Sequence, residues 1–476
     1  MTTKGHLLAM KFNWNDILGH YKGSNYSMGD VVSFAQSTGC DLETTIKLVA
    51  EKFPIIKKLE MRNTSTPYLA IEPVGSHIDS SAYEQMNLAA SLPVFVGGAL
   101  MPDAHSGYAL PVGGVAVLEG ALSPSFVGYD IGCRMTLSEL CIFENEIPAA
   151  IAAIKKIARF GFQTNEGQNE QWHPVLENPL WSEISVLRAL KDKARLQLGT
   201  SGSGNHFIDL MRVNGGFALL THSGSRGIGY NVATHYMKLA EKICPANTPR
   251  GYEYLPFDTE GGQEYWAAMQ LMGQYAQACH HVIHARIHAA LLMSGVELNG
   301  PECDVPGLLV HEIFADVDGN IGFETVNLIE NHHNFAWKEG QNFIHRKGAT
   351  PAAIGQLGII PGSSGSYSYV VQGAYNGLQT SEGDARLSPT WNSASHGAGR
   401  VSSRKVAKAN HDAAAMAQHY ENFGVELWGV APDETVAAYK NISDVMLAQG
   451  QQVEILAQLK PIFVAMGGLE KSDDGD

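Results

Sequence analysis

The stretch Gly128-Tyr129-Asp130-Ile131-Gly132-Cys133-Arg134-Met135 is the one around which the chain is most plainly organised. It sets a carboxylate, Asp130, three residues before a thiol, Cys133, and its glycines let the backbone approach a ligand closely. Carboxylate and thiolate are anionic ligand types that bind divalent metals. A lone cysteine is more often a small buried hydrophobe, so the octapeptide alone leaves both interpretations open.

The composition is that of a large globular protein. The 476 residues are 45% hydrophobic, and no apolar run is long enough to span a membrane. We find no N-terminal signal pattern and therefore expect a cytoplasmic protein without a membrane partner. The 6 cysteines include no Cys-x-x-Cys pair, which argues against a structural zinc site and a disulfide framework.

The net charge of -15 limits the mode of any nucleic-acid binding. Proteins that coat nucleic acid non-specifically are usually basic, because phosphate neutralisation supplies most of their affinity. An acidic protein that acts on RNA needs a local positive cleft and bound cations. Solubility is the simpler explanation of the acidity.

Hydrophobic spacing predicts a mixture of helices and short strands. Residues 1–65 read as a helical extension, and glycine-broken strands begin near Tyr68, including 113–118 and 217–220. Further helices are predicted over the segments 147–160, 181–196, 263–294, 406–420 and 443–457.

The long predicted helix over 263–294 carries His280, His284 and His288 at intervals of four residues, on one face. A metal ladder would need further ligands, and no carboxylate lies close by in the sequence. We favour a solvated or interdomain helix face.

Three glycine-rich loops have the character of phosphate sites: residues 199–204, 361–368 and 397–400. Their backbone N–H groups and hydroxyls would suit a nucleoside triphosphate, although none matches a P-loop. The segment 221–227 adds an imidazole, hydroxyls and a guanidinium, which makes it a candidate anion-binding cluster.

Six metal-ligand side chains lie in successive glycine-rich turns. One carboxylate, one thiol and three or four imidazoles exceed the needs of a tetrahedral ion, so they could hold two ions with the cysteine bridging. Zinc, manganese, iron and cobalt all fit these donors. Separate core histidines are the alternative, but the repeated setting favours one shared site, made by Asp130, Cys133, His206, His222, His333 and His396.

His396 stands apart because Gly397 and Gly399 leave it uncrowded, with backbone N–H groups nearby. A histidine framed in this way could attack an α-phosphate and form a phosphoramidate. Two cations would offset the charge of the triphosphate and of a nucleic-acid phosphate. The residues therefore point to nucleotidyl transfer.

From about residue 66 to about 467, the chain resembles the RtcB family of RNA-splicing ligases. The resemblance rests on long, ordered motifs: Met101-Pro102-Asp103-Ala104-His105, Val127-Gly128-Tyr129-Asp130-Ile131-Gly132-Cys133, Gly204-Asn205-His206-Phe207, His222-Ser223-Gly224-Ser225-Arg226-Gly227, His333-Asn334, His345-Arg346-Lys347-Gly348-Ala349, Pro361-Gly362-Ser363 and Ser395-His396-Gly397-Ala398-Gly399-Arg400.

The resemblance implies a ligase that uses GTP and two Mn²⁺ ions to join an RNA 3′-phosphate or 2′,3′-cyclic phosphate to a 5′-hydroxyl. His396 would be the nucleophile that carries GMP, and Asp103 would orient it. The metal ligands it implies are Asp130, Cys133, His206, His222 and His333.

The resemblance also implies a nucleotide site, an RNA site and a fold. It implies an α+β fold, with central β-sheets around the metal and nucleotide cleft, over residues 66–476. The expected nucleotide-binding residues are Asn205, His206, Asp209, His333, Asn334, Ser363, Ser368, His396, Gly397, Ala398, Gly399 and Tyr439. The expected RNA-phosphate ligands are Arg226, Arg346, Lys347 and Arg400.

Several positions depart from the family pattern. Asp209 stands where the family usually has Glu, and Met466 where it usually has Lys; both family residues read the guanine base. Cys279-His280 replaces an expected Asn-Arg, and Arg134 replaces a glycine. We therefore expect a divergent member or paralogue with weakened guanine selectivity.

Two other functions remain open on the sequence. The weakened guanine contacts would also suit a metal-dependent phosphoesterase that processes RNA ends without nucleotide. A non-catalytic RNA-end binding module would keep the cleft and join nothing. An accessory activating protein is an additional expected partner.

Overall fold

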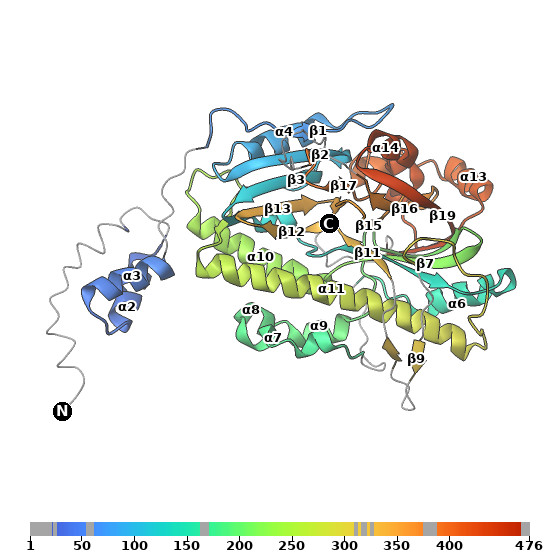
Figure 1. The fold of residues 1–476 in the computed structure, drawn as a ribbon, viewed down its shortest axis with the longest axis horizontal. Coiled ribbons are helices and arrows are strands. Elements are labelled where there is room, and N and C mark those ends of the chain that lie inside the picture. Colours follow the sequence, from blue (N-terminus) through green and yellow to red (C-terminus); the bar gives the residue numbers. More distant parts are fainter. Residues whose placement is uncertain are drawn as a thin grey trace.

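The structure is a computed structural model that describes residues 21, 26–53, 61–161, 171–308, 313–315, 321–323, 328–374 and 388–467. The predicted extension over 1–65 lies partly outside the described residues. Within it, α2 (Met28–Ser37) and α3 (Leu42–Lys52) are helices, and Asp41 caps α3 by accepting from the Thr44 N–H at 2.9 Å. Figure 1 shows this pair to one side of the main body.

Two β-sheets form the centre of the main body (Figure 1). The smaller sheet is antiparallel apart from its β1–β2 edge and has the order β1 (Leu69–Ala70), β2 (Phe95–His105), β3 (Val112–Glu119), β13 (Asn342–Lys347), β12 (Asn334–Glu339). The larger sheet has the order β11 (Ile329–His332), β5 (Arg134–Leu140), β7 (Gly216–Ser223), β6 (Phe207–Val213), β19 (Val453–Met466), β16 (Ser368–Gly373), β15 (Leu357–Ile360), with β18 (Glu426–Trp428) beside β19.

Three two-stranded pairs complete the described strands. They are β4 (Ala121–Leu122) with β8 (Leu255–Pro256), β9 (Ile313–Ala315) with β10 (Ile321–Phe323), and β14 (Ala349–Pro351) with β17 (Ser393–Ser395). The last pair matters for the site, because β17 ends at the residue before His396.

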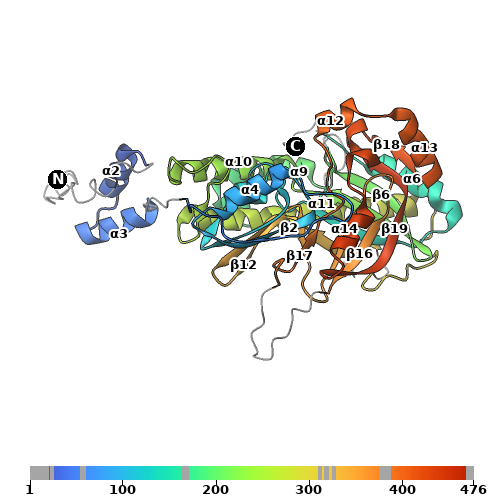
Figure 2. The ribbon, with the colours of Figure 1, turned by 90° about the horizontal axis from the view of Figure 1, so that it is seen from above.

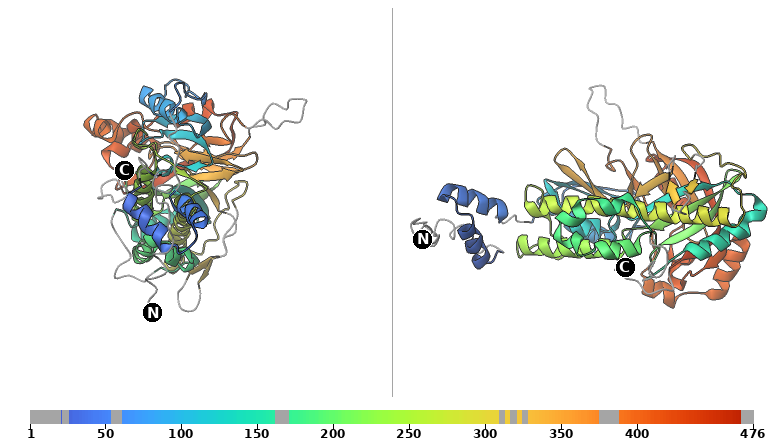
Figure 3. Two further views of the ribbon diagram at one scale, coloured as in Figure 1. Left: turned by 90° about the vertical axis from the view of Figure 1, so that its left-hand side faces the viewer. Right: turned by 90° about the horizontal axis from the view of Figure 1, so that it is seen from below.

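Helices cover the outer faces of the sheets, and α11 runs along the length of the body beside α10 (Figure 1, Figure 3). In Figure 2, α4 lies over the smaller sheet. The helices of the body are α4 (Ser80–Ala90), α5 (Pro124–Val127), α6 (Ile147–Ile157), α7 (Leu180–Glu183), α8 (Ser185–Arg188), α9 (Lys191–Gln197), α10 (Arg226–Ile243), α11 (Glu260–Met293), α12 (Arg404–Ala409), α13 (Ala413–Phe423) and α14 (Ile442–Ala448), with 3₁₀ turns at Glu144–Glu146, Pro174–Glu177, Pro432–Glu434 and Val436–Ala438.

The larger sheet is buried on both faces, and strand alternation divides its side chains between two cores. Phe207 and Met211 pack in one core with Leu220 of β7, whereas Ile208 and Leu210 pack in the other with α6 and α11. Polar side chains follow the same alternation, so neighbours in sequence point to opposite sides of this sheet. The α+β fold with central sheets is confirmed.

Three predicted helices differ from the structure. The helix predicted over 406–420 is two helices, α12 and α13, with residues 410–412 between them. The helix predicted over 443–457 ends at Ala448, and the chain then enters β19, where burial alternates from Ala457 to Phe463. An apolar run such as this fits either element until its pairing with β6 and β16 is known. The helix predicted over 181–196 is three short helices. Among the described residues, no helix is both long and apolar enough to cross a membrane.

Candidate active site

A cavity of about 940 Å³ lies where both sheets and the loops after their strands meet. Cys133 directly precedes β5, His206 precedes β6, and His333 follows β11, so each side chain is held at the end of a strand. Rigid strands carrying polar residues at their ends are a common way to build a site. The cavity is large enough for a nucleotide.

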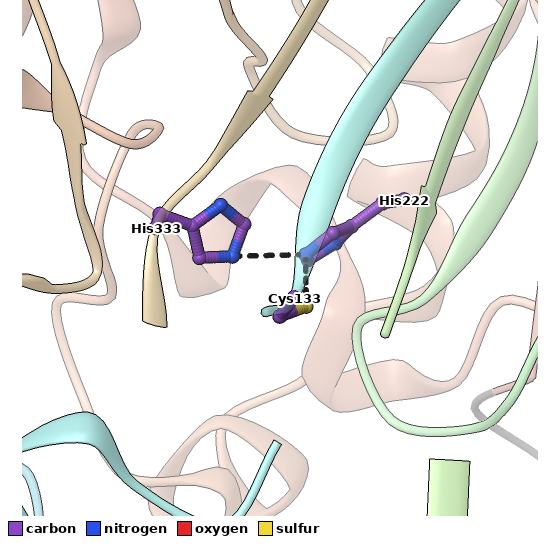
Figure 4. A group of neighbouring side chains, drawn as sticks. All are labelled: Cys133, His222 and His333. Atoms are coloured by element: carbon purple, nitrogen blue, oxygen red, sulfur yellow. Dashed lines mark hydrogen bonds between the residues drawn. The ribbon is translucent and has the colours of Figure 1, made fainter. Parts of the chain in front are cut away.

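Three of the predicted metal ligands converge on one point. The Cys133 Sγ atom lies 3.1 Å from His222 Nε2, which lies 3.3 Å from His333 Nε2. Figure 4 shows both imidazole edges turned toward one another beside the sulfur. All three residues are buried, and their ligand atoms lie close enough together to hold one metal ion.

A second group shares the same sulfur. Cys133 Sγ lies 3.4 Å from His206 Nε2, which lies 3.1 Å from Asp130 Oδ2. Gly224 makes room for this carboxylate, since a Cβ added there would lie 2.1 Å from both Asp130 oxygens. The Ser225 N–H then donates to Asp130 Oδ1 at 2.9 Å. The two groups meet at Cys133, which is the arrangement expected of a bridging thiolate.

Two histidines of this cluster, His222 and His333, are in the form that binds metal. His222 Nδ1 lies 3.1 Å from the Asn205 carbonyl, so Nδ1–H is the donor and Nε2 carries the lone pair that faces the cluster. Burial lowers the pKa of His222 and His333 well below the usual histidine range and keeps both neutral at pH 7. Neutral imidazole is the ligand form, so the donor set fits a divalent metal.

His396 and Asp103 form a pair beside the cluster. Asp103 Oδ2 lies 2.7 Å from His396 Nδ1 and also accepts from the Gly397 N–H at 3.3 Å. This contact fixes the proton on Nδ1 and leaves the Nε2 lone pair available for attack. The rings of His396 and His333 lie 4.9 Å apart, so the predicted nucleophile adjoins a predicted metal ligand.

Gly399 allows this pair to form. Its φ is +72°, and a Cβ added there would lie 2.1 Å from the Asp103 carbonyl oxygen. Another residue would therefore push the His396 loop away from β2. Lys440 supports the same strand, because its Nζ donates to the carbonyls of Pro102 and Ala104, on either side of Asp103, at 3.0 and 2.8 Å. Sequence reasoning missed this lysine, although it directly follows Tyr439.

The predicted nucleotide-binding residues all line this cavity. Ser368 accepts from the Gly362 N–H at 3.1 Å and shapes the loop after β15. Tyr439 donates to Glu434, and its ring lies 5.2 Å from the Arg400 guanidinium. The structure thus brings together Asn205, His206, Asp209, His333, Asn334, Ser363, Ser368, His396, Gly397, Ala398, Gly399 and Tyr439.

The predicted RNA-phosphate ligands are divided. Lys347 and Arg400 line the cavity. Arg226 is 1% exposed and donates to Thr200 Oγ1 and the Gly161 carbonyl, so it braces the loop beneath the site. Arg346 is 2% exposed and donates to Ser393 and to the Trp391 carbonyl. Both guanidiniums are buried against protein carbonyls and hydroxyls, and direct phosphate contacts by Arg226 and Arg346 stay a prediction.

A family model described as tRNA-splicing ligase RtcB matches residues 85–467. The chain belongs to the RtcB family. It is 28% identical over 436 residues to the RNA-splicing ligase RtcB of Escherichia coli K12, covering 86% of this chain and 99% of that protein. It is 27% identical to the tRNA-splicing ligase RtcB of Thermococcus kodakarensis, covering 81% of this chain and 90% of the relative. The predicted resemblance is confirmed.

This RtcB-family chain buries three histidines of α11. His280, His284 and His288 are at most 3% exposed. The expectation of a solvated or interdomain helix face is therefore wrong. Side chains alternate along β7, so His222 faces the cavity while Thr221 faces α11 and contacts His280 and His284.

The hydrogen bonds between these histidines run in one direction. His280 Nε2 donates to the Ser223 carbonyl at 3.0 Å, so its Nδ1 accepts from the Thr221 hydroxyl at 2.6 Å. The same hydroxyl oxygen then accepts from His284 Nε2 at 2.8 Å. His284 Nδ1 in turn accepts from Ser138 at 2.6 Å. Each of these side chains has its hydrogen-bond partners, so the buried network joins α11 to β5 and β7 and stabilises both strands.

Two residues that depart from the family pattern, Arg134 and His280, lie close enough for the charge of one to act on the other. Arg134 is buried, donates to the Gly273 carbonyl of α11 at 3.2 Å, and pairs with Glu330 at 3.7 Å. Desolvation is the main cause that lowers the pKa of His280, to about 3, and the Arg134 charge adds to it. This RtcB-family member therefore carries a buried guanidinium on β5, at Arg134, and an imidazole at position 280 of α11, where the resemblance led us to expect an arginine.

Proposed function

We propose that this protein is an RNA ligase that joins an RNA 3′-phosphate or 2′,3′-cyclic phosphate end to a 5′-hydroxyl end, using GTP and two Mn²⁺ ions. The observation that carries the proposal is the His396–Asp103 pair at 2.7 Å, directly beside the Cys133 cluster. The names of the relatives, RNA-splicing and tRNA-splicing ligases, support the same reaction class.

His396 is the proposed nucleophile. Its Nε2 attacks the α-phosphate of GTP, a P–N bond forms, and pyrophosphate leaves. Asp103 holds Nδ1–H and stabilises the charge that develops on the ring. The guanylate then passes to the RNA 3′-phosphate and restores His396. Attack by the 5′-hydroxyl forms the new phosphodiester and releases GMP. A cyclic phosphate end is first opened by water.

Asp130, Cys133, His206, His222 and His333 are the proposed ligands of the two ions. Bound there, the cations would offset the charge of the triphosphate and of the RNA phosphate beside His396. Thiolate, imidazole and carboxylate donors admit manganese and also zinc, iron and cobalt. Lys347 and Arg400 line the same cavity and add positive charge for the RNA.

Labelling with α-³²P-GTP and Mn²⁺ tests the proposal. We expect a protein adduct that is labile in acid and stable in alkali, because a phosphoramidate has that behaviour, and we expect none in His396→Ala. An adduct that persists in His396→Ala contradicts the mechanism. Turnover of cyclic-phosphate ends without nucleotide would favour the phosphoesterase, and equal binding of RNA ends without joining would favour the binding module.

Three expectations from the sequence remain predictions beside this proposal. They are the division into an extension (1–65) and a ligase domain (66–476), a cytoplasmic location, and an accessory activating protein.

A further inference from the structure

One wall of the cavity is apolar and is formed by the paired strands β6 and β19. Phe207 lies opposite Met466, and Asp209 lies opposite Val464. Since alternate residues of a strand share a face, all four side chains point to the same side, and all four line the cavity. Three of its four side chains are apolar and the fourth is a carboxyl, and the Phe207 ring lies 5.4 Å from the ring of His222.

Within the part of the chain that the structure describes, no charged side chain pairs with that carboxyl. Asp209 is 7% exposed, and its buried Oδ1 has no hydrogen-bond partner. Burial raises its pKa well above the usual range for aspartate, and the Ala465 N–H offsets this only in part. The side chains that flank it in the sheet are those of Leu220 and Val464, which carry no charge. A carboxylate is costly in such a place, so the neutral acid is the form that fits.

The protonation state decides which edge of a base Asp209 can pair with. A carboxylate offers acceptors only, and these match the adjacent N1–H and N2–H donors of guanine. A neutral carboxyl offers one donor and one acceptor. That pair matches N6–H and N1 of adenine, and it equally matches N1–H and O6 of guanine. A lysine near the acid would favour the ionised form, but Met466 occupies the wall instead.

We propose that this wall holds a purine base and that Asp209 accepts adenine and guanine alike, so that the protein uses ATP as well as GTP. The inference rests on the proposed nucleotidyl transfer, and it makes Asp209 the residue that sets base selectivity. Phe207 and Met466 supply the contact with the faces of the ring, for which an aromatic group and a polarizable thioether are well suited.

Equilibrium binding tests this without turnover. Calorimetric titrations would use analogues of ATP, GTP, CTP and UTP with a methylene between the α- and β-phosphates. We expect the Kd values for the two purines to agree within about tenfold. A preference for guanine above about a hundredfold would overturn the inference and leave the proposed ligase standing. Failure of all four analogues to bind would overturn both.

Two variants separate the neutral acid from the carboxylate. Asp209→Asn preserves one donor and one acceptor, so both purine Kd values should stay within about threefold of the wild type. A selective loss of guanine binding by more than about tenfold would show instead that a carboxylate reads the base.

Met466→Lys should hold Asp209 ionised and raise the preference for guanine at least about tenfold, whereas Met466→Leu should leave the ratio unchanged. An unchanged ratio in a folded Met466→Lys protein would contradict the inference. Circular dichroism checks folding, and the Asp209→Asn result decides the matter if the lysine variant does not fold.

Discussion

The Nδ1 atom of His396 lies 2.7 Å from Oδ2 of Asp103, although 293 residues separate the two in the sequence. The contact joins a loop that follows β17 to the irregular end of β2, and Gly399 gives the loop room to approach. It fixes which ring nitrogen carries the proton, and this supports the proposed role of His396 as a nucleophile.

Asp103→Asn should therefore reduce adduct formation by about a hundredfold or more while the fold is retained. The amide can donate to Nδ1, which would move the ring proton to Nε2 and remove the attacking lone pair. Asp192→Asn, on the exposed surface of α9, is the matched control and should react like the wild type. Adduct formation at the wild-type rate in Asp103→Asn would refute the orienting role.

Cys133→Ala should disrupt both groups of metal ligands, because the sulfur belongs to each. We expect the metal content after dialysis against Mn²⁺ to fall from about two ions per chain to below one. The Co²⁺-loaded variant should also lose its thiolate charge-transfer absorption. Cys40→Ser, in the α2–α3 segment, should change neither signal. Two tightly held ions in Cys133→Ala would contradict a shared sulfur.

Thr221→Val should destabilise the protein by about 1–3 kcal/mol, because it removes the hydroxyl that links His280 and His284 in a buried site. Urea unfolding measures the change, and the slope of the transition shows whether two-state behaviour is kept. Thr221→Ser keeps the hydroxyl, so its free energy of unfolding should fall by less than that of Thr221→Val. An unchanged free energy of unfolding in Thr221→Val would contradict a stabilising role of these hydrogen bonds.

Acid should weaken the fold before the carboxylates titrate. Burial lowers the pKa of His280 to about 3 and that of His345 to about 4. Below about pH 6.5 these imidazoles take up protons in the unfolded chain but stay neutral in the native protein. Their contribution to the free energy of unfolding is therefore complete above about pH 6.5 and falls as the pH is lowered toward about 4. His345→Gln should flatten the decline of the melting temperature over this range. An unchanged slope would show that His345 is not buried in its neutral form.

The sequence predicted which donor side chains lie together better than it predicted the strands and helices that hold them. Asp130, Cys133 and His222 could be grouped because glycine-rich turns and donor chemistry are local properties. The burial of His280 behind Thr221 could not be predicted, since it depends on β7 packing against α11. The strand over 453–466 differs in part from the predicted helix for the same reason. Its apolar pattern fits a helix or a strand, and pairing with β6 and β16 makes it a strand.

The hydrogen-bond partners of the two buried arginines could not be predicted from the sequence either. Arg226 lies in a motif of serines and glycines, and Arg346 lies beside Lys347 and Gly348; both are settings in which phosphate sites occur. Only the positions of the Gly161 and Trp391 carbonyls show that both guanidiniums are used within the protein. A charged side chain is almost never buried without such partners, but their identity is a property of the tertiary fold.

The central claim is that His396 carries the nucleotide. Digestion of the Mn²⁺- and GTP-treated protein at alkaline pH, followed by tandem mass spectrometry, would identify the modified side chain. We predict one GMP on the peptide that contains His396 and nowhere else. Lys347 and Lys440 also line the cavity, and GMP on either lysine, or on no residue at all, would contradict the account.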